Sequence, residues 1–291
     1  MREYIISCES TVDTNPERIA ELGIPVVHLS VHGGDEHMAD DMTYETALGL
    51  YNRMREGASF STSQPAPSDY VAAWRPYLER EMDVLHISLS SAISGSINSA
   101  RVARDQLHAE FGDDRIRVID SLAASGGYGM LIEHANAMKC AGKTRNQLAD
   151  AVEDLKLFIY HWFSTDEVKY LARSGRLSKG SAFIADVLQI KPVMNMDYIG
   201  RLVPREKTKG RKRALTSMAQ HLFAEIDIER NPFIGITHSD CMGDVDYLIS
   251  LIHERYPELP VTVWTVGAVV GCHTGPGVVA LYFIAKEPRV N

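Results

Sequence analysis

The sequence lacks long apolar runs, paired cysteines and an excess of basic residues, and each shortage excludes a class of protein. No stretch approaches the ~18 apolar residues that span a bilayer, and the apolar part of the N-terminus is too short for a signal peptide. Its four cysteines are scattered without a CxxC pair, which favours free thiols in a reducing cytoplasm. A net charge of −8 argues against a general nucleic-acid binder.

The composition is that of an ordinary soluble globular protein. The chain has 291 residues, of which 45% are hydrophobic and 23% are charged, so wholesale disorder is excluded. At roughly 100–200 residues per domain, this length predicts one large domain or two.

The first half of the chain alternates short apolar runs with helical patterns, which is typical of βαβ units and a parallel sheet. The expected strands are Tyr4–Ser7, Pro25–Val31, Val84–Leu89 and Ile116–Ile119. The expected helices are Pro16–Leu22, Ser68–Glu81, Ser96–Phe111 and Ala123–Ala141. Gly33-Gly34 predicts a small hairpin excursion near 28–42, followed by a helix Tyr44–Glu56 that Thr43 caps.

The pattern changes after about residue 156. Gln189–Met194 and Ile199–Lys207 read as a hairpin of two strands, and three later strands alternate with helical segments. These later strands are Phe233–His238, Val261–Val266 and Val279–Lys286. We therefore predict an α/β protein of two domains, a parallel βαβ domain over 1–156 and an α+β domain over 157–291.

Three segments combine hydroxyl residues and glycines. Ser90–Ala100 lies between an apolar strand and a helix, and predicts an anion or carboxylate cradle, with a serine-rich helix cap as the alternative. Ser61–Ser68 is a Pro-stiffened connection, or part of a site if it faces Ser94. Gly267–Gly277 holds four glycines and a proline, so it should present His273 to a ligand from a constrained loop.

Other patterns are weaker. His28, His32 and His37 lack the spacing of a zinc site, so we expect no metal. Gly142-Lys143-Thr144 ends like a phosphate loop, but Ala137 stands where its first glycine should be. The absence of G-x-S-x-G disfavours the common hydrolase elbow, although other serine hydrolases stay open.

Basic residues gather at Arg173–Arg176 and between Arg201 and Arg213, in an otherwise acidic chain. These residues form either a solvated face or a surface that docks a partner or faces an anion.

Taken together, these motifs resemble the DegV family, the fatty-acid-binding proteins that serve as acyl carriers for bacterial fatty acid kinase. The resemblance runs through almost the whole chain. The matching motifs are Ser10…Asp13, Thr62-Ser63-Gln64-Pro65, Ser94-Gly95-Ser96…Ser99-Ala100, Asp120-Ser121 with Gly126, Gly127 and Gly129, Ser174-Gly175-Arg176-Leu177-Ser178, Ile190-Lys191-Pro192 and Gly271…His273…Gly275-Pro276-Gly277. The sequence departs from the family pattern at Glu9, where aspartate is usual, and at Ala66, where serine is expected.

The resemblance implies a lipid site between the two domains. Thr62, Ser94, Gly95 and His273 would bind the fatty acid carboxylate. The supporting loop residues would be Ser63, Gln64, Ser96, Gly271, Thr274 and Gly275. Candidate walls for the acyl chain are Ile93, Ile97, Phe183, Ile184, Val187 and Leu188, although a plain hydrophobic core explains these residues equally well. The basic residues Arg173, Arg176, Arg205, Lys207 and Arg211 would face a partner or the acyl phosphate.

The resemblance also implies a carrier rather than an enzyme. The protein would present a long-chain fatty acid to a separate ATP-dependent kinase, without cofactor, metal or nucleic acid. It would be cytoplasmic, with transient contact at a membrane surface. One alternative is an acyl hydrolase that uses Ser94 and His273 as nucleophile and base. Another is a carbonyl-substrate subunit like that of dihydroxyacetone kinases, with a small polar pocket. The acidic balance and the lack of a helix-turn-helix signature disfavour a regulatory protein.

Overall fold

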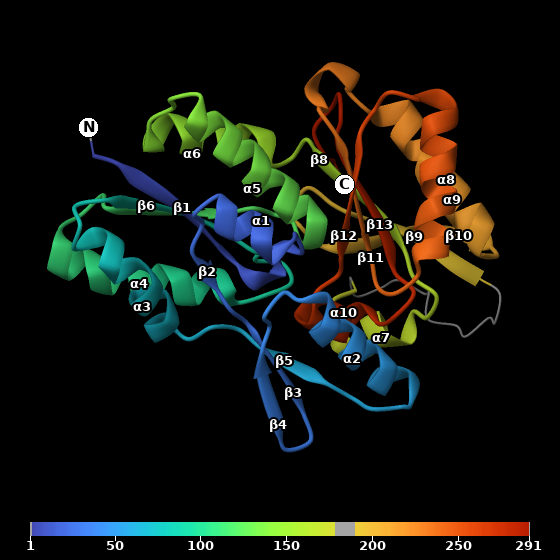
Figure 1. Ribbon diagram of the computed structural model, residues 1–291, viewed down its shortest axis with the longest axis horizontal. Helices are drawn as coiled ribbons and strands as arrows, with labels where there is room; N and C mark the ends of the chain where they lie inside the picture. Colours follow the sequence, from blue (N-terminus) through green and yellow to red (C-terminus); the bar gives the residue numbers. More distant parts are fainter. Residues whose placement is uncertain (1, 178–189, 291) are drawn as a thin grey trace.

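The computed structural model describes residues 2–177 and 190–290 and contains two larger β-sheets and one small sheet (Figure 1). The first sheet is wholly parallel, as the sequence predicts. Its strands, in spatial order, are β2 (Val26–Val27), β1 (Tyr4–Glu9), β6 (Asp83–Ser88) and β7 (Ile116–Asp120). Because parallel strands need crossovers, helices cover both faces of this sheet.

Two layers of helices bury the alternating side chains of the first sheet. Ile5 packs with Trp74 on one face, whereas Ile6 packs in the separate core on the other. The first face is covered by α3 (Pro67–Leu78) and α4 (Ser96–Phe111). The second face is covered by α1 (Pro16–Glu21), α5 (Ser125–Cys140) and α6 (Arg145–Leu155).

The expected hairpin excursion is present and forms the third sheet. Its antiparallel strands are β4 (Glu36–Ala39), β3 (Ser30–Gly33) and β5 (Ser61–Ser63). The helix α2 (Tyr44–Arg55) follows, and the backbone N–H of Thr46 donates to the Thr43 hydroxyl at 3.3 Å, which confirms the expected cap.

Two expectations for this region are wrong. Residues Pro25–Val31 are not one strand, because the chain leaves the first sheet after Val27 and enters the third sheet at Ser30. The start of the Ser61–Ser68 segment is not a loop, since Ser61–Ser63 pairs with the free edge of β3.

The second sheet is mixed. Its strands, in spatial order, are β10 (Leu202–Lys209), β9 (Ile190–Met196), β8 (Ile159–Ser164), β13 (Val279–Ile284), β11 (Ile234–His238) and β12 (Val261–Thr265). The pair of β9 and β10 is antiparallel, as the expected hairpin requires. Two helices, α8 (Arg211–Glu225) and α9 (Met242–Arg255), cover one face. The fold is thus an α/β protein with a parallel first part and a mixed second part.

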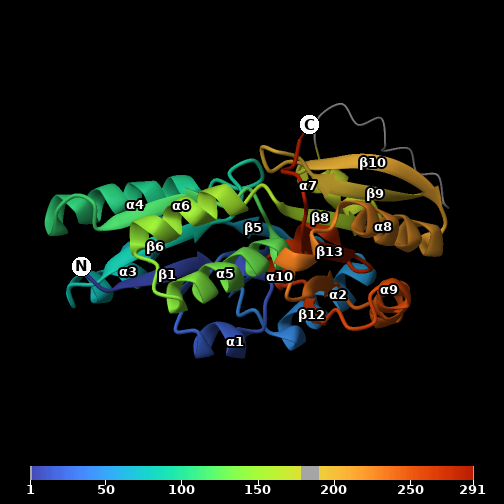
Figure 2. The same ribbon diagram turned by 90° about the horizontal axis from the view of Figure 1, so that it is seen from above.

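The two larger sheets meet through α5, which packs against β8, β11 and β13 (Figure 2). Two glycines permit this contact. A Cβ on Gly127 would lie 2.1 Å from His161 Nε2, and one on Gly126 would lie 2.6 Å from the Tyr282 ring. A side chain at either position would push the sheets apart. The division at residue 156 falls just after α6 and stays a prediction.

A buried carboxylate ties the elements of the first part together. Glu9 ends β1 with no exposed surface, and its oxygens accept hydrogen bonds from three hydroxyls and one backbone N–H. The donors are Tyr70 of α3 (2.9 Å), Ser88 of β6 (2.7 Å), Tyr128 of α5 (2.8 Å) and the Leu89 N–H (2.8 Å). Burial would raise the pKa of Glu9, but His86 beside it and these donors lower the pKa overall.

We expect Glu9→Gln to lower the free energy of unfolding by about 3 kcal/mol, because each buried donor that loses its acceptor costs about 1–3 kcal/mol. Urea unfolding measures this change. Glu17→Gln, an exposed change in the first turn of α1, serves as the control and should stay within about 0.5 kcal/mol of the wild type. Equal stabilities of the two variants would contradict the role assigned to Glu9.

Candidate functional site

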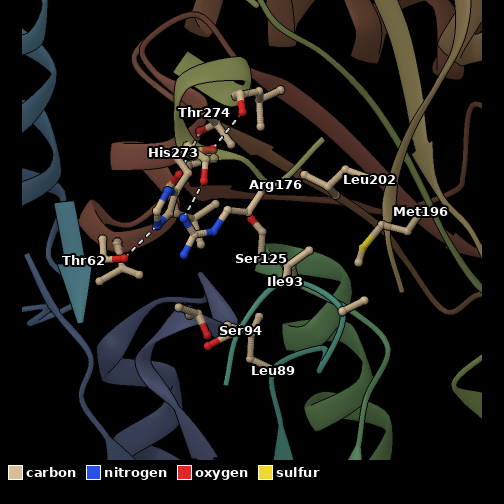
Figure 3. Close-up of a pocket in the computed structure, with 18 of the residues that line it drawn as sticks. Thr62, Leu89, Ile93, Ser94, Ser125, Arg176, Met196, Leu202, His273 and Thr274 are labelled. Carbon is tan, nitrogen blue, oxygen red and sulfur yellow. Dashed lines mark hydrogen bonds between the residues drawn. The ribbon is translucent and has the colours of Figure 1, made fainter. Parts of the chain in front are cut away.

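A cavity of about 790 Å³ opens where the carboxyl end of the first sheet meets the second sheet. Both halves of the chain line it (Figure 3). Thr62 and Ser94 come from the first half, whereas Arg176, Met196 and His273 come from the second half. Its volume lies in the range of pockets that enclose small organic ligands.

Ser94 lies in the loop that connects β6 to α4. Its hydroxyl accepts a hydrogen bond from the backbone N–H of Ser96 at 3.2 Å, and the Ser94 and Ser96 oxygens are 2.8 Å apart. Gly95 is the N-cap of α4, so the positive end of a sixteen-residue helix faces this loop. The loop therefore has the components of an anion cradle.

The segment after β5 lies directly against the Ser94 loop. A Cβ on Gly95 would lie 2.3 Å from Gln64 Oε1, so only glycine allows Gln64 to pack there. The Gln64 amide donates to the Ser99 hydroxyl of α4 at 3.0 Å. Ser63 lines the cavity, and its hydroxyl lies 2.7 Å from His32 Nε2.

His273 stands on a short helix, α10 (Ala268–Thr274), and not on the loop that the sequence predicts. Two of the four glycines occupy the ends of this helix: Gly267 is its N-cap and Gly275 its C-cap. The interior residues make helical bonds, such as the Gly271 N–H to the Gly267 carbonyl at 2.8 Å. Thr274 donates its hydroxyl to the Val270 carbonyl at 3.1 Å.

His273 and Thr62 form a pair at one side of the cavity, with 2.8 Å between Nε2 and Oγ1 (Figure 3). Burial, aided by the nearby Arg176 charge, lowers the pKa of His273 to about 4. The imidazole is therefore neutral at pH 7 and can serve as a hydrogen-bond partner but not as a charge.

Arg176 supplies the positive charge that His273 lacks. Its side chain is partly buried at the cavity wall, and Nη1 donates to the Ser174 carbonyl at 2.6 Å. Figure 3 shows its guanidinium beside the His273 ring and facing the Ser94 loop. A guanidinium together with hydroxyls and a helix N-terminus is suited to an anionic head group.

The remaining walls are largely apolar. They include Leu29, Leu89, Ile93, Phe163, Leu171, Met196, Leu202 and Val269. Of the expected wall residues, Ile93 lines the cavity, whereas Ile97 is fully buried in the protein interior. Phe183, Ile184, Val187 and Leu188 lie outside the described residues.

Sequence reasoning missed several polar residues of the cavity wall. They are Thr11, Ser125, His161, Thr237 and Tyr282. The last three lie on strands whose apolar neighbours conceal them in the sequence. Ser125 had a usable signal, because it follows the carboxyl end of β7 in a parallel sheet, where ligands commonly bind.

The predicted basic residues occupy three different settings. Arg205 and Lys207 are exposed on the edge strand β10, and Arg173 is exposed with its guanidinium 5.6 Å from the centre of the Tyr170 ring. Arg211 differs, because its side chain is only 14% exposed and its Nε donates to Asp244 Oδ2 at 2.8 Å. Its charge is thus already paired within the fold.

The three clustered histidines do not converge on one point. His28 Nδ1 lies 2.6 Å from the Asp40 carbonyl oxygen, whereas His32 stacks on His37 with 4.6 Å between the ring centres. Over residues 2–177 and 190–290, no group of three His, Cys, Asp or Glu side chains is placed to hold a metal ion. In the same ranges, no helix is long and apolar enough to cross a membrane.

Two buried carboxyl groups, those of Asp13 and Asp40, lie behind α10. Asp13 Oδ1 accepts from the Gly267 N–H at 3.0 Å, and Asp40 accepts from Met42 N–H at 3.4 Å. A Cβ on Gly267 would lie 2.8 Å from Asp13 and 3.6 Å from Asp40, so both groups meet the start of this helix. Burial raises the pKa of Asp13 well above its usual value and that of Asp40 to about 6.

Between about pH 4 and about pH 6, the native state keeps a proton on Asp40 that the unfolded state releases. The free energy of unfolding should therefore fall as the pH rises through this range. We expect Asp40→Asn to shrink the difference in unfolding free energy between pH 4.5 and pH 7.5 by about 2 kcal/mol.

Denaturant unfolding at the two pH values tests this expectation. Asp41→Asn is the control and should leave the difference nearly unchanged, because hydrogen bonds from Thr43 and Thr46 outweigh burial and lower the pKa of Asp41, so this group stays ionised across the tested range. The same shift in both variants would contradict the assignment.

The geometry does not favour a hydrolytic serine–histidine pair. The partner of His273 is Thr62, and the partner of Ser94 is Ser96. No hydrogen bond joins Ser94 to His273, and no carboxylate of the described residues orients the His273 ring. A nucleophile and its base would require both contacts.

Comparisons with known proteins agree with one another. A family model described as an uncharacterised protein of the DegV family matches residues 5–286. A DegV domain-containing protein of Clostridium perfringens is 34% identical over 291 residues, which cover 99% of this chain and 100% of the relative.

Solved structures share the fold. One is a fatty-acid-binding DegV family protein of Thermus thermophilus, which is 28% identical to this chain with a TM-score of 0.86. The match covers 98% of this chain and 100% of the Thermus thermophilus chain. The fatty acid kinase (Fak) B3 protein of Streptococcus pneumoniae, loaded with linoleic acid, is 21% identical with a TM-score of 0.84. It covers 98% of this chain and 100% of its own, and at this identity the likeness extends to the fold alone.

Proposed function

Since the chain belongs to the DegV family, we propose that it binds a long-chain fatty acid in the cavity between its two larger sheets. The carboxylate is bound by Thr62, Ser94, Gly95 and His273, and the acyl chain lies along the apolar walls. The observation that carries this proposal is the position of a hydroxyl-rich helix start at one side of a large, mainly apolar cavity.

The charges of the site support a carboxylate ligand. His273 is neutral at pH 7, so Arg176 is the cation of the head-group region. A carboxylate removed from water needs several donors, because an unpaired charge in an apolar site is costly. Thr62, Ser94, Arg176 and the N–H groups at the start of α4 can supply them.

We expect the purified protein to carry a fatty acid, which extraction under denaturing conditions and mass spectrometry would reveal. After lipid removal, Ser94→Ala and Thr62→Val should each weaken palmitate binding about tenfold or more, because each removes a hydrogen bond to a charged group.

Ser91→Ala is the matched control, since Ser91 lines the same cavity, but only its backbone N–H makes a hydrogen bond, to Asp120. This variant should bind palmitate like the wild type. A protein that yields no lipid and binds no added palmitate would refute the proposed function.

The same proposal includes a carrier role without catalysis. The bound fatty acid is presented to a separate ATP-dependent kinase, which forms the acyl phosphate. The protein exchanges its lipid through transient contact with a membrane surface. Arg205 and Lys207 on the exposed side of β10 belong to the kinase-docking surface. Arg211 is paired with Asp244 and contributes only indirectly, through the structure that carries this surface. Arg176 lines the cavity and would face the acyl phosphate together with Arg173, which packs on the nearby Tyr170 ring.

Acyl phosphate formation with ATP, palmitate and a purified cognate kinase tests this role. We expect turnover only when this protein is present, and a loss of several-fold in Arg205→Glu/Lys207→Glu at low salt, since exposed charges steer association. Arg101→Glu, an exposed change on α4, is the control. Acyl phosphate made without the kinase would refute the carrier role, and unchanged turnover of the double variant would place the docking surface elsewhere.

A further inference from the structure

Arg289, close to the end of the chain, is a buried cation. Its residue is only 5% exposed, and burial lowers the pKa of its guanidinium to about 10, so the group stays charged at pH 7. Among the described residues, its side chain makes hydrogen bonds to backbone carbonyls but to no carboxylate. Burying a charge in this way costs free energy, so the contacts that Arg289 makes indicate its role.

The guanidinium donates to carbonyls from three different segments. Nη2 donates to Leu122, in the loop between β7 and α5, at 2.9 Å, and to Lys156, at the end of α6, at 3.0 Å. Nη1 donates to Asp197, in the turn between β9 and β10, at 3.2 Å. The direction of these bonds is fixed, because a guanidinium only donates and a carbonyl only accepts. Arg289 therefore ties the first half of the chain to the second.

Two of these segments carry residues of the cavity wall. Ser125 lines the cavity shortly after Leu122 in the chain. Met196, which directly precedes Asp197, lines it on the other side together with Leu202, its partner across the hairpin (Figure 3). Leu122 has a φ of +50°, a left-handed conformation that a leucine rarely adopts, so surrounding contacts must hold this loop in place.

A further hydrogen bond holds the same β9–β10 turn. The Ser90 hydroxyl donates to the Gly200 carbonyl at 3.0 Å. The fit is close, because a Cβ on Gly200 would lie 2.1 Å from Ser90 Oγ and 3.1 Å from Leu122 Cα. Ser90 also begins the loop that carries Ser94, whose backbone N–H donates to the Ser90 carbonyl at 3.2 Å. The turn is thus held against two loops that line the cavity.

We propose that Arg289 is a positioning residue, which holds the β9–β10 turn against the β7–α5 loop and so slows the release of the bound fatty acid. Arg289 does not line the cavity and touches no ligand itself. The proposal rests on the proposed function, because it places the fatty acid in this cavity. Without the guanidinium, three buried carbonyls lose their donor, and the two sides of the wall can separate more easily.

Release of palmitate from loaded protein into excess albumin tests the proposal. Arg289→Met keeps an unbranched side chain but removes its donors, and we expect release to become about three- to tenfold faster. Backbone amides of the β9–β10 turn should also exchange faster with deuterium, as measured by mass spectrometry. Arg289→Lys keeps the charge but lacks the forked guanidinium, so it should release palmitate faster as well.

Arg115→Met is the matched control. Arg115 is also buried and donates to two carbonyls, those of Met82 at 3.3 Å and Phe111 at 3.5 Å. It lies just before β7, at the amino end of the first sheet, whereas the cavity lies at the carboxyl end. This variant should lower the free energy of unfolding without changing palmitate release or deuterium exchange in the turn.

Ser90→Ala removes a single hydrogen bond from the same turn and should speed release about two- to threefold. It decides the question if Arg289→Met does not fold. A wild-type release rate in Arg289→Met, or in Ser90→Ala where that variant decides, would overturn the proposal. So would a wild-type rate in Arg289→Lys, which would show that charge alone matters, or equal acceleration in Arg115→Met. A wild-type protein that binds no palmitate would instead refute the proposed function.

Discussion

The buried Glu9 carboxylate is the interaction on which the site depends. It joins α3, β6 and α5 to the end of β1, and its bond to the Leu89 N–H fixes the point where the Ser94 loop begins. A charge with no exposed surface requires several donors, so none of these elements can shift without leaving a donor or the charge unpaired. The same buried carboxylate therefore stabilises the fold of the first part and fixes the geometry of the loop.

The second constraint is the close approach of α5 to the second sheet. Gly126 and Gly127 allow this helix to touch Tyr282 and His161, which brings the two larger sheets to opposite sides of one cavity. The third sheet then places Thr62 beside α10, where it meets His273. Four segments far apart in the sequence thus supply the proposed head-group site.

The electrostatics of this site suit the binding of an anionic head group. Burial keeps His273 neutral, and Ser94 and His273 have separate partners, so neither activates the other. Among the described residues, Arg176 is the one cationic side chain that lines the cavity. These features support the proposed fatty acid site, in which a separate kinase would carry out the chemistry.

The sequence by itself determined most of the elements, the parallel first sheet and the family, because strand and helix periodicities are local and the motifs keep their order and spacing. It also indicated Ser94, since a hydroxyl-rich turn after an apolar strand is a local signal. It did not reveal β5 or α10, because the pairing partner of Ser61–Ser63 and the packing of Ala268–Thr274 lie far along the chain. Only the tertiary structure decided that Thr62 meets His273, that Arg211 pairs with Asp244, and that Tyr70 donates to the buried Glu9. Each of these contacts joins residues far apart in the chain, so no local sequence pattern indicates it.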